Sequence, residues 1–170
     1  SWICSKVVGT IQSADRKKLC WIGSGKTAKS GKGELKMDIF DECIEALRNE
    51  GEVIVLSEEE SNEVLKEFKE NIPLDWFVGK VDFNRIPRKK EIVDDEDILE
   101  ELHKNNVDVN EQVYVFWFNA DLPVIQTSIK NIIHVFDEVI SVDFDTWIFC
   151  PKERYVVEYY HEGETFLGFY

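Results

Sequence analysis

The segment VYVFWF, residues 113–118, places six apolar side chains in direct succession. Successive side chains of a strand point to opposite faces of a sheet, so a run without polar alternation needs cover on both faces. The segment therefore predicts a central strand with other elements packed above and below it. The rest of the chain must supply those covering elements.

Four segments are predicted as helices because apolar residues recur in them at three- and four-residue spacing. The first runs from Asp38, a candidate N-cap, to Gly51, and the second begins with a capping box at Ser57 and ends near Asn71. The third opens at Asp94, and the fourth covers residues 127–136. Their apolar residues are Ile39, Phe40, Cys43, Ile44 and Leu47; Val64, Leu65 and Phe68; Ile98, Leu99 and Leu102; and Ile129, Ile132, Ile133 and Phe136.

Strands are predicted between and after these helices. Residues 2–8 are predicted as a strand or a buried N-terminal segment, and residues 18–22 as a short strand. Residues 52–56 are predicted as a buried strand, and residues 74–83 as a strand or an edge hairpin. Pro87 keeps the basic segment 85–90 in a turn. The chain then ends in strands at 139–142, 146–149, 155–160 and 165–170, of which the last three form an antiparallel meander. The pattern predicts an α+β fold with a mixed or mostly antiparallel sheet and about four packed helices.

The length of 170 residues suits a single domain spanning the whole chain, and a hydrophobic fraction of 44 % provides a real core. No apolar run is long enough for a membrane span, and the start of the chain lacks the pattern of a signal peptide, so a cytoplasmic location is expected. The four cysteines form no C-x-x-C pair, so they are expected to be buried and reduced. A disulfide between Cys4 and Cys20 stays open.

The segment GSGKT, residues 23–27, looks like half of a phosphate-binding loop. The full loop needs a glycine at position 20, where this chain has Cys20, and a helix after Thr27, where two more glycines follow instead. The segment is therefore predicted to be a solvated loop, and no nucleotide or other cofactor is expected. Its lysines belong to a basic N-terminal part.

The net charge of −14 is unevenly placed along the chain. Residues 1–40 hold eight Lys and Arg against three Asp and Glu, whereas residues 41–170 hold twelve against thirty-one. Residues 41–170 are acidic enough to repel nucleic acid and anionic membranes. Long-range attraction would instead draw the protein toward a basic partner. The alternative is that the acidity only maintains solubility.

No group of residues matches a catalytic template well. The segment His161–Glu164 lacks the spacing of a zinc protease motif and is predicted to be a hairpin turn. Cys150 and His161 could imitate a thiol–imidazole pair across the meander, although Cys150 could equally fill the core. Carboxylates at strand ends can serve as acid and base or hold magnesium, or they can be turn residues, which suits Asp121, Asp143 and Asp145 better. His103 and His134 are predicted to be ordinary surface or packing residues.

The C-terminal sequences WIFCP, residues 147–151, and YVVEYYHEGE, residues 155–164, resemble the end of immunity proteins from bacterial contact-dependent growth inhibition and polymorphic toxin systems. The resemblance covers about 25 residues. It implies a cytoplasmic antidote that binds a toxin domain, often a nuclease, and blocks its active site or substrate groove.

We therefore expect a non-enzymatic protein that covers the basic active-site cleft of a cognate toxin with clustered acids, and that binds neither nucleic acid nor membranes. The expected contact residues are Asp94, Asp95, Glu96, Asp97, Glu100, Glu101, Asp143, Asp145, Glu58 and Glu59. Aromatic anchors should lie beside them. Two alternatives remain: a small metal-dependent enzyme using Asp121, Asp143, Asp145 or His161, and an adaptor with no toxin partner.

Overall fold

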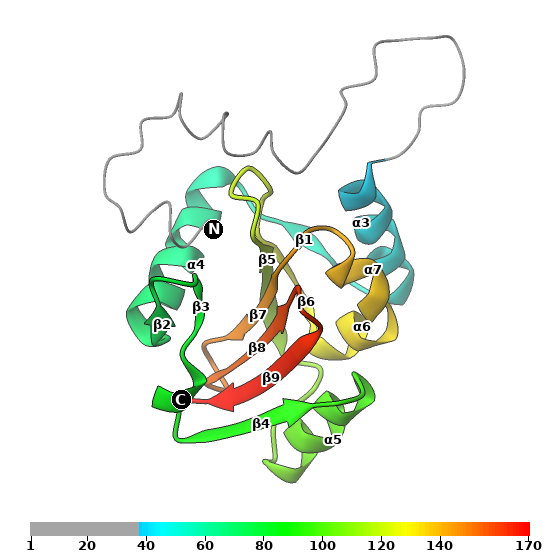
Figure 1. Ribbon diagram of the computed structural model, residues 1–170. Coiled ribbons are helices and arrows are strands. Elements are labelled where there is room, and N and C mark those ends of the chain that lie inside the picture. Colours follow the sequence, from blue (N-terminus) through cyan, green and yellow to red (C-terminus); the bar gives the residue numbers. More distant parts are fainter. Residues whose placement is uncertain (1–37) are drawn as a thin grey trace, which may run out of the picture.

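A computed structural model describes residues 38–170 of the chain (Figure 1). The strands predicted over residues 2–8 and 18–22, the GSGKT segment, Cys4 and Cys20 lie outside the described residues. The described elements follow one another as α3 (Ile39–Glu50), β1 (Ile54–Val55), α4 (Glu58–Asn71), β2 (Leu74–Asp75), β3 (Lys80–Val81), the 3-10 helix η2 (Phe83–Arg85), β4 (Arg88–Ile92), α5 (Glu96–Lys104), β5 (Gln112–Trp117), β6 (Ile125–Ser128), α6 (Ile129–His134), α7 (Phe136–Ile140), β7 (Thr146–Cys150), β8 (Tyr155–Tyr160) and β9 (Glu164–Phe169).

Seven of these strands form one antiparallel sheet in the order β1-β6-β5-β7-β8-β9-β4. The predicted C-terminal meander is confirmed, because β7, β8 and β9 pair as consecutive antiparallel strands. The small hairpin of β2 and β3 is separate from the large sheet. The fold is therefore α+β, as predicted.

Both faces of the sheet are covered. Helices α3, α5, α6 and α7 pack on one face, and α4 packs on the other together with the β2–β3 hairpin (Figure 1). In β7, Ile148 belongs to the first core, while Trp147 and Phe149 belong to the second. In β5, Val115 and Phe116 divide in the same way, so the prediction of a covered strand at VYVFWF is confirmed.

The prediction of a strand over residues 139–142 is wrong, because Val139 and Ile140 end helix α7 and the next two residues form a turn. The helix predicted over residues 127–136 begins only at Ile129 and is interrupted at Val135, where φ is −129° and ψ is 40°. A new helical turn then buries Val139, whose carbonyl oxygen accepts a hydrogen bond from Trp117 Nε1 at 2.8 Å. Burial of Val139 on the helix face outweighs the strand preference of β-branched residues.

The basic segment 85–90 is only partly a turn, which corrects a second prediction. Arg88 starts strand β4, which pairs with β9 along its whole length. Pro87 restricts its own backbone and that of the residue before it, but it places no limit on the residues that follow. The strand can therefore begin directly after the proline.

The apolar run at 52–56 does not form a buried strand. Only Ile54 and Val55 are in β1, and they are 44 % and 40 % exposed. Within the part of the chain that the structure describes, the strand lies at the edge of the sheet and pairs only with β6. Composition alone predicts burial of such a run, but it does not show where in the sheet the strand lies.

Candidate partner-binding surface

The register of the sheet brings distant parts of the chain to one end of the molecule. Trp117, Thr146, Tyr159, Thr165 and Ile92 are successive Cα partners across β5, β7, β8, β9 and β4. The segments just beyond this row therefore lie at the same end of the strands. We call them the strand-end surface, which consists of residues 93–97, 118–122, 143–145 and 161–164.

The start of helix α4 lies at the same end of the sheet. The amide of Leu56 donates to the carbonyl of Val124 at 2.9 Å, and the amide of Val124 donates to Ser61 Oγ at 3.1 Å. The predicted capping box is confirmed, since Ser57 and Glu60 exchange hydrogen bonds at the first turn. Glu58 and Glu59, both exposed, are thereby held beside the strand-end surface.

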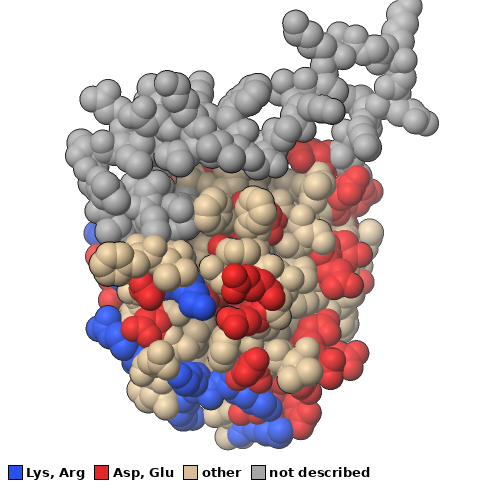
Figure 2. Space-filling model, in the orientation of Figure 1, with Lys and Arg blue, Asp and Glu red and all other residues tan. Residues whose placement is uncertain are grey.

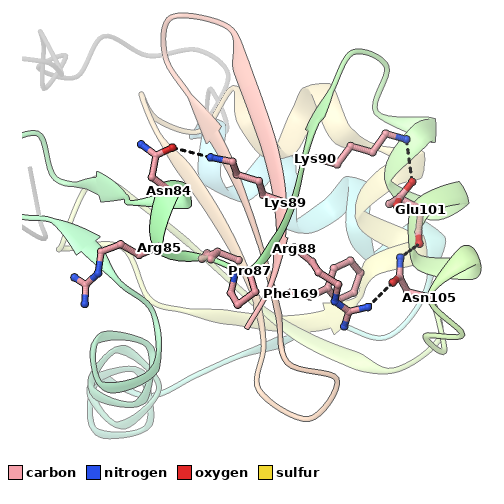
Figure 3. Close-up of a pocket in the computed structure, with 10 residues that line it drawn as sticks. Asn84, Arg85, Pro87, Arg88, Lys89, Lys90, Glu101, Asn105 and Phe169 are labelled. Carbon is pink, nitrogen blue, oxygen red and sulfur yellow. Dashed lines mark hydrogen bonds and ion pairs between the residues drawn. The ribbon is translucent and has the colours of Figure 1, made fainter.

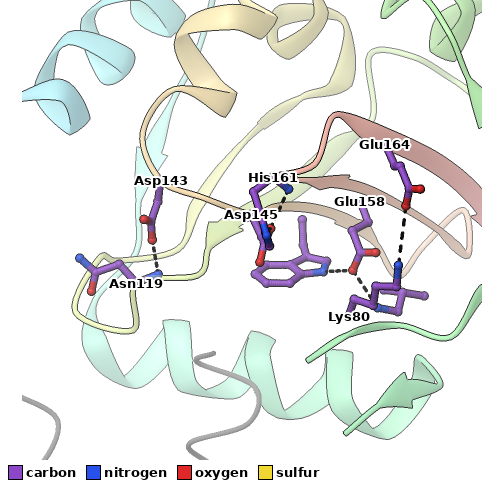
Figure 4. A network of polar contacts seen from close by, with 9 residues as sticks. Lys80, Asn119, Asp143, Asp145, Glu158, His161 and Glu164 are labelled. Atoms are coloured by element: carbon purple, nitrogen blue, oxygen red, sulfur yellow. Dashed lines mark hydrogen bonds and ion pairs between the residues drawn. The ribbon is translucent and has the colours of Figure 1, made fainter. Parts of the chain in front are cut away.

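Two predicted contact residues, Asp143 and Asp145, hold loops of this surface together (Figure 4). Asp145 is only 3 % exposed, accepts a hydrogen bond from the amide of His161 at 2.9 Å, and lies 2.9 Å from His161 Nδ1. Asp143 accepts from the amide of Asn119 at 2.5 Å, and burial raises its pKa. Both residues lie in the loop between α7 and β7.

An exposed ring lies between these two carboxylates. Phe144 is 56 % exposed and makes edge-on contacts with the rings of Phe118 and His161, each at 6.2 Å between centroids. An aromatic side chain beside acids is the arrangement expected for an anchor of a protein interface.

The remaining predicted contact residues lie just before helix α5 and within it. Asp94 and Glu96 are exposed, while Asp95 and Asp97 are half-buried. Asp95 makes no side-chain hydrogen bond to the helix start, so capping does not occupy it. Further along, Glu100 pairs with Lys104 at 2.7 Å and Glu101 with Lys90 at 2.9 Å. The partner-binding role of all ten residues stays a prediction.

The thiol–imidazole pair is excluded by the topology of the meander. Cys150 is opposite Tyr155 at one end of the β7–β8 pair, whereas His161 follows Tyr160 at the other end. Cys150 and Cys43 are buried free thiols, as predicted, and burial raises the pKa of both. Within residues 38–170, no group of three His, Cys, Asp or Glu side chains is arranged to hold a metal ion.

One carboxylate of structural importance, Glu158, was not singled out from the sequence. It is 2 % exposed and accepts hydrogen bonds from the Val81 amide at 2.7 Å and from Trp147 Nε1 at 2.6 Å (Figure 4). Burial raises its pKa to about 7. Glu158 thus fastens the β2–β3 hairpin to the sheet, and its place inside the apolar run YVVEYY was the available signal.

No helix in the described part of the chain is long and apolar enough to cross a membrane. Residues 37–168, more than three quarters of the chain, match the family described as CdiI immunity protein, EcoliA0-like. No curated protein matches the chain significantly. The resemblance seen in the sequence concerned the C-terminal strands alone, whereas the family match also covers the helices on both faces of the sheet. The chain therefore belongs to the EcoliA0-like family of CdiI immunity proteins, which makes it a toxin-neutralising protein of a contact-dependent growth inhibition system.

Proposed function

We propose that the chain neutralises a nuclease toxin by placing the strand-end surface over the basic active-site cleft of that toxin. One observation carries the proposal: acid-bearing segments far apart in the sequence gather at one end of the sheet, beside the exposed ring of Phe144. A nuclease must hold a polyanion, so its cleft is basic. An acidic surface can occupy that cleft in place of the substrate.

The size of the surface suits one side of a protein interface. From β6 to β4 the sheet spans five strand spacings, or about 24 Å. A standard interface covers about 800 Å² on each partner. A single toxin domain could therefore contact both the start of α4 and the segment that follows β4.

The experiment that tests the proposal uses two matched charge reversals and the cognate toxin. The first variant, Asp94→Lys with Glu96→Lys, changes two exposed acids at the strand-end surface. The control, Glu67→Lys with Glu70→Lys, changes two exposed acids at the far end of α4. Glu67 is close enough to Tyr170 to influence its pKa, and Tyr170 follows the end of β9 that is remote from the strand-end surface. Both variants alter the net charge equally.

Each protein is co-expressed with the toxin, and toxin binding and nucleic-acid cleavage are measured with purified components. We expect wild type and the control variant to protect cells and to inhibit cleavage. The strand-end variant should bind the toxin at least about tenfold more weakly. A toxin that cleaves no nucleic acid would refute the nuclease assignment. Equal weakening by both variants would refute the assignment of the surface.

A further inference from the structure

The described part of the chain contains one concentrated basic region. Residues 38–170 carry twelve Lys and Arg against thirty-two Asp and Glu, yet four of the twelve cations lie within residues 85–90. Figure 2 shows basic side chains gathered at the lower end of the molecule, where β4 lies, and acidic ones along the side formed by the helices. One third of the cations of residues 38–170 therefore lie within six consecutive residues.

The four cations line a groove of about 650 Å³ along the outer edge of β4 (Figure 3). One wall comes from η2, with Asn84 and Arg85, on the side of the sheet that α4 covers. The other wall comes from the end of α5, with Glu101 and Asn105. The edge strand therefore forms the floor between two walls.

Among residues 38–170, most of these cations have no acidic partner. Arg88 donates to Asn105 Oδ1 at 2.9 Å, and its guanidinium lies 5.0 Å from the centroid of the Phe169 ring. Lys89 donates to Asn84 Oδ1 at 2.7 Å. Of the four cations, only Lys90 pairs with a carboxylate of the described residues, that of Glu101. An amide oxygen orients a cation without neutralising its charge. In the described part of the chain, the groove thus holds three cations whose charge no salt bridge balances: Arg85, Arg88 and Lys89.

The floor of the groove offers backbone hydrogen bonds as well as charge. Among the described residues 38–170, strand β4 is the last strand of the sheet and pairs only with β9. Alternate amides and carbonyls of such an edge strand point outward and can pair with an added extended segment. A second copy of this basic strand would be repelled, whereas an acidic segment would be attracted.

We propose that the β4 groove binds an extended acidic segment of a partner protein as an added strand. Five residues of β4 can pair with a segment about 17 Å long. Carboxylates of the segment would reach Arg88 and Lys89 from the two sides of the strand. A nucleic acid is the poorer occupant, because it offers no backbone ladder and the surrounding acids repel it. This site is distinct from the strand-end surface and independent of the toxin's reaction.

The test measures binding of the full chain to labelled ten-residue peptides by fluorescence anisotropy. In the probe peptide pairs of Glu alternate with pairs of Thr, so that an added strand points carboxylates to both faces of the sheet. In the second peptide Gln replaces Glu, and in the third a central Pro interrupts the acidic sequence. We expect the probe to bind at least about tenfold more tightly than either of the other two, because one lacks charge and the other cannot pair as a strand. Hydrogen exchange should slow within β4 when the probe binds.

Protein variants locate the site. Arg88→Gln with Lys89→Gln should weaken binding of the probe about tenfold. The matched control, Arg48→Gln with Lys66→Gln, removes two exposed cations from α3 and α4 and should leave binding unchanged. Thermal unfolding of each variant establishes that it is folded, and the proline peptide tests strand pairing with the wild-type protein.

Three results would overturn the proposal. The first is equal binding of the Glu and Gln peptides. The second is self-association of the Arg88→Gln, Lys89→Gln variant with unchanged peptide binding, which would mean that the cations only protect the edge. The third is tighter binding of a single-stranded oligonucleotide of equal charge than of the probe.

Discussion

At the scale of single residues, Glu158 combines a structural role with a cost in stability. Its carboxylate sits under the β2–β3 hairpin and receives two N–H donors. The burial that makes these hydrogen bonds strong also disfavours the ionised form. The pKa of about 7 therefore links the attachment of the hairpin to pH.

Replacing Glu158 with Gln should remove a pH dependence of stability. In the folded chain the pKa of Glu158 is about 7, against an ordinary value of 4.5 for a glutamate, so between these values the folded state binds more protons than the unfolded state. The stabilisation relative to the unfolded state is complete below pH 4.5 and is lost as pH rises through 7. The loss amounts to about 3 kcal/mol.

Urea unfolding of wild type and Glu158→Gln from acid to slightly alkaline pH measures this effect. The difference in unfolding free energy between the two proteins should move in favour of Gln as pH rises. Glu162→Gln, at an exposed turn residue, is the control and should show no such trend. A constant difference between wild type and Glu158→Gln would contradict the burial argument.

Phe144 provides a second prediction at the residue scale. If it anchors the toxin, Phe144→Ala should weaken the complex by at least about 2 kcal/mol, because interface energy concentrates in aromatic residues that become buried. Phe77, 99 % exposed at the tip of the β2–β3 hairpin and outside the strand-end surface, is the matched control. Calorimetric titration with the toxin measures both. A larger loss for Phe77→Ala would move the interface toward the hairpin.

At the scale of elements, the sequence predicts those segments whose pattern is decided locally. The capping box at Ser57 and the apolar stripe of Ile98 and Leu102 are examples, since both depend on neighbours within one or two turns. The errors at β1 and α7 have a different origin. Whether Ile54 is covered, and whether Val139 packs as helix or strand, depends on elements distant in the sequence. The helix and strand propensities of single residues do not describe such long-range packing.

The junction between η2 and β9 gives a prediction at this scale. A Cβ on Gly168 would lie 3.0 Å from Ile86 Cγ2 and 3.0 Å from Phe83 Cε1. Gly168 also pairs with both β8 and β4, so its backbone cannot easily move away. Gly168→Ala should therefore destabilise the fold by about 1–3 kcal/mol through overpacking.

A double-mutant cycle with Ile86→Val checks that the clash is the cause. Valine lacks the Cδ1 atom that would lie 3.1 Å from the new Cβ, so the double variant should lose less stability than the sum of the two single variants. Denaturant midpoints of all four proteins give the coupling. Additive losses would mean that Ile86 Cδ1 does not contribute and that the strain comes from Ile86 Cγ2 and Phe83 Cε1.

At the scale of the whole molecule, the charge count predicted an acidic protein, but it did not show where the charges lie. Acids that are far apart in the sequence meet at the strand-end surface because five strands end in the same row. The basic groove was missed because residues 85–90 were interpreted as a turn, although Arg88 begins an edge strand. The strand-end surface and the β4 groove both depend on the order of the strands in the sheet. Local sequence patterns do not predict that order.

If the strand-end acids steer the toxin, the association should depend on salt. Between about 10 and 150 mM salt, the screening length falls from about 30 to 8 Å, so long-range attraction is largely lost. The association rate of wild type should fall at least about tenfold over this range, while the dissociation rate changes little. Stopped-flow mixing at several salt concentrations measures both rates.

The two charge-reversal variants separate local steering from net charge. Asp94→Lys with Glu96→Lys and Glu67→Lys with Glu70→Lys shift the net charge equally, so a pure net-charge effect would slow association equally. If the strand-end surface steers the toxin, the first variant should associate more slowly and show the shallower dependence on salt. An association rate that ignores salt in all three proteins would mean that the complex forms without steering, and the strand-end acids would then act only after contact.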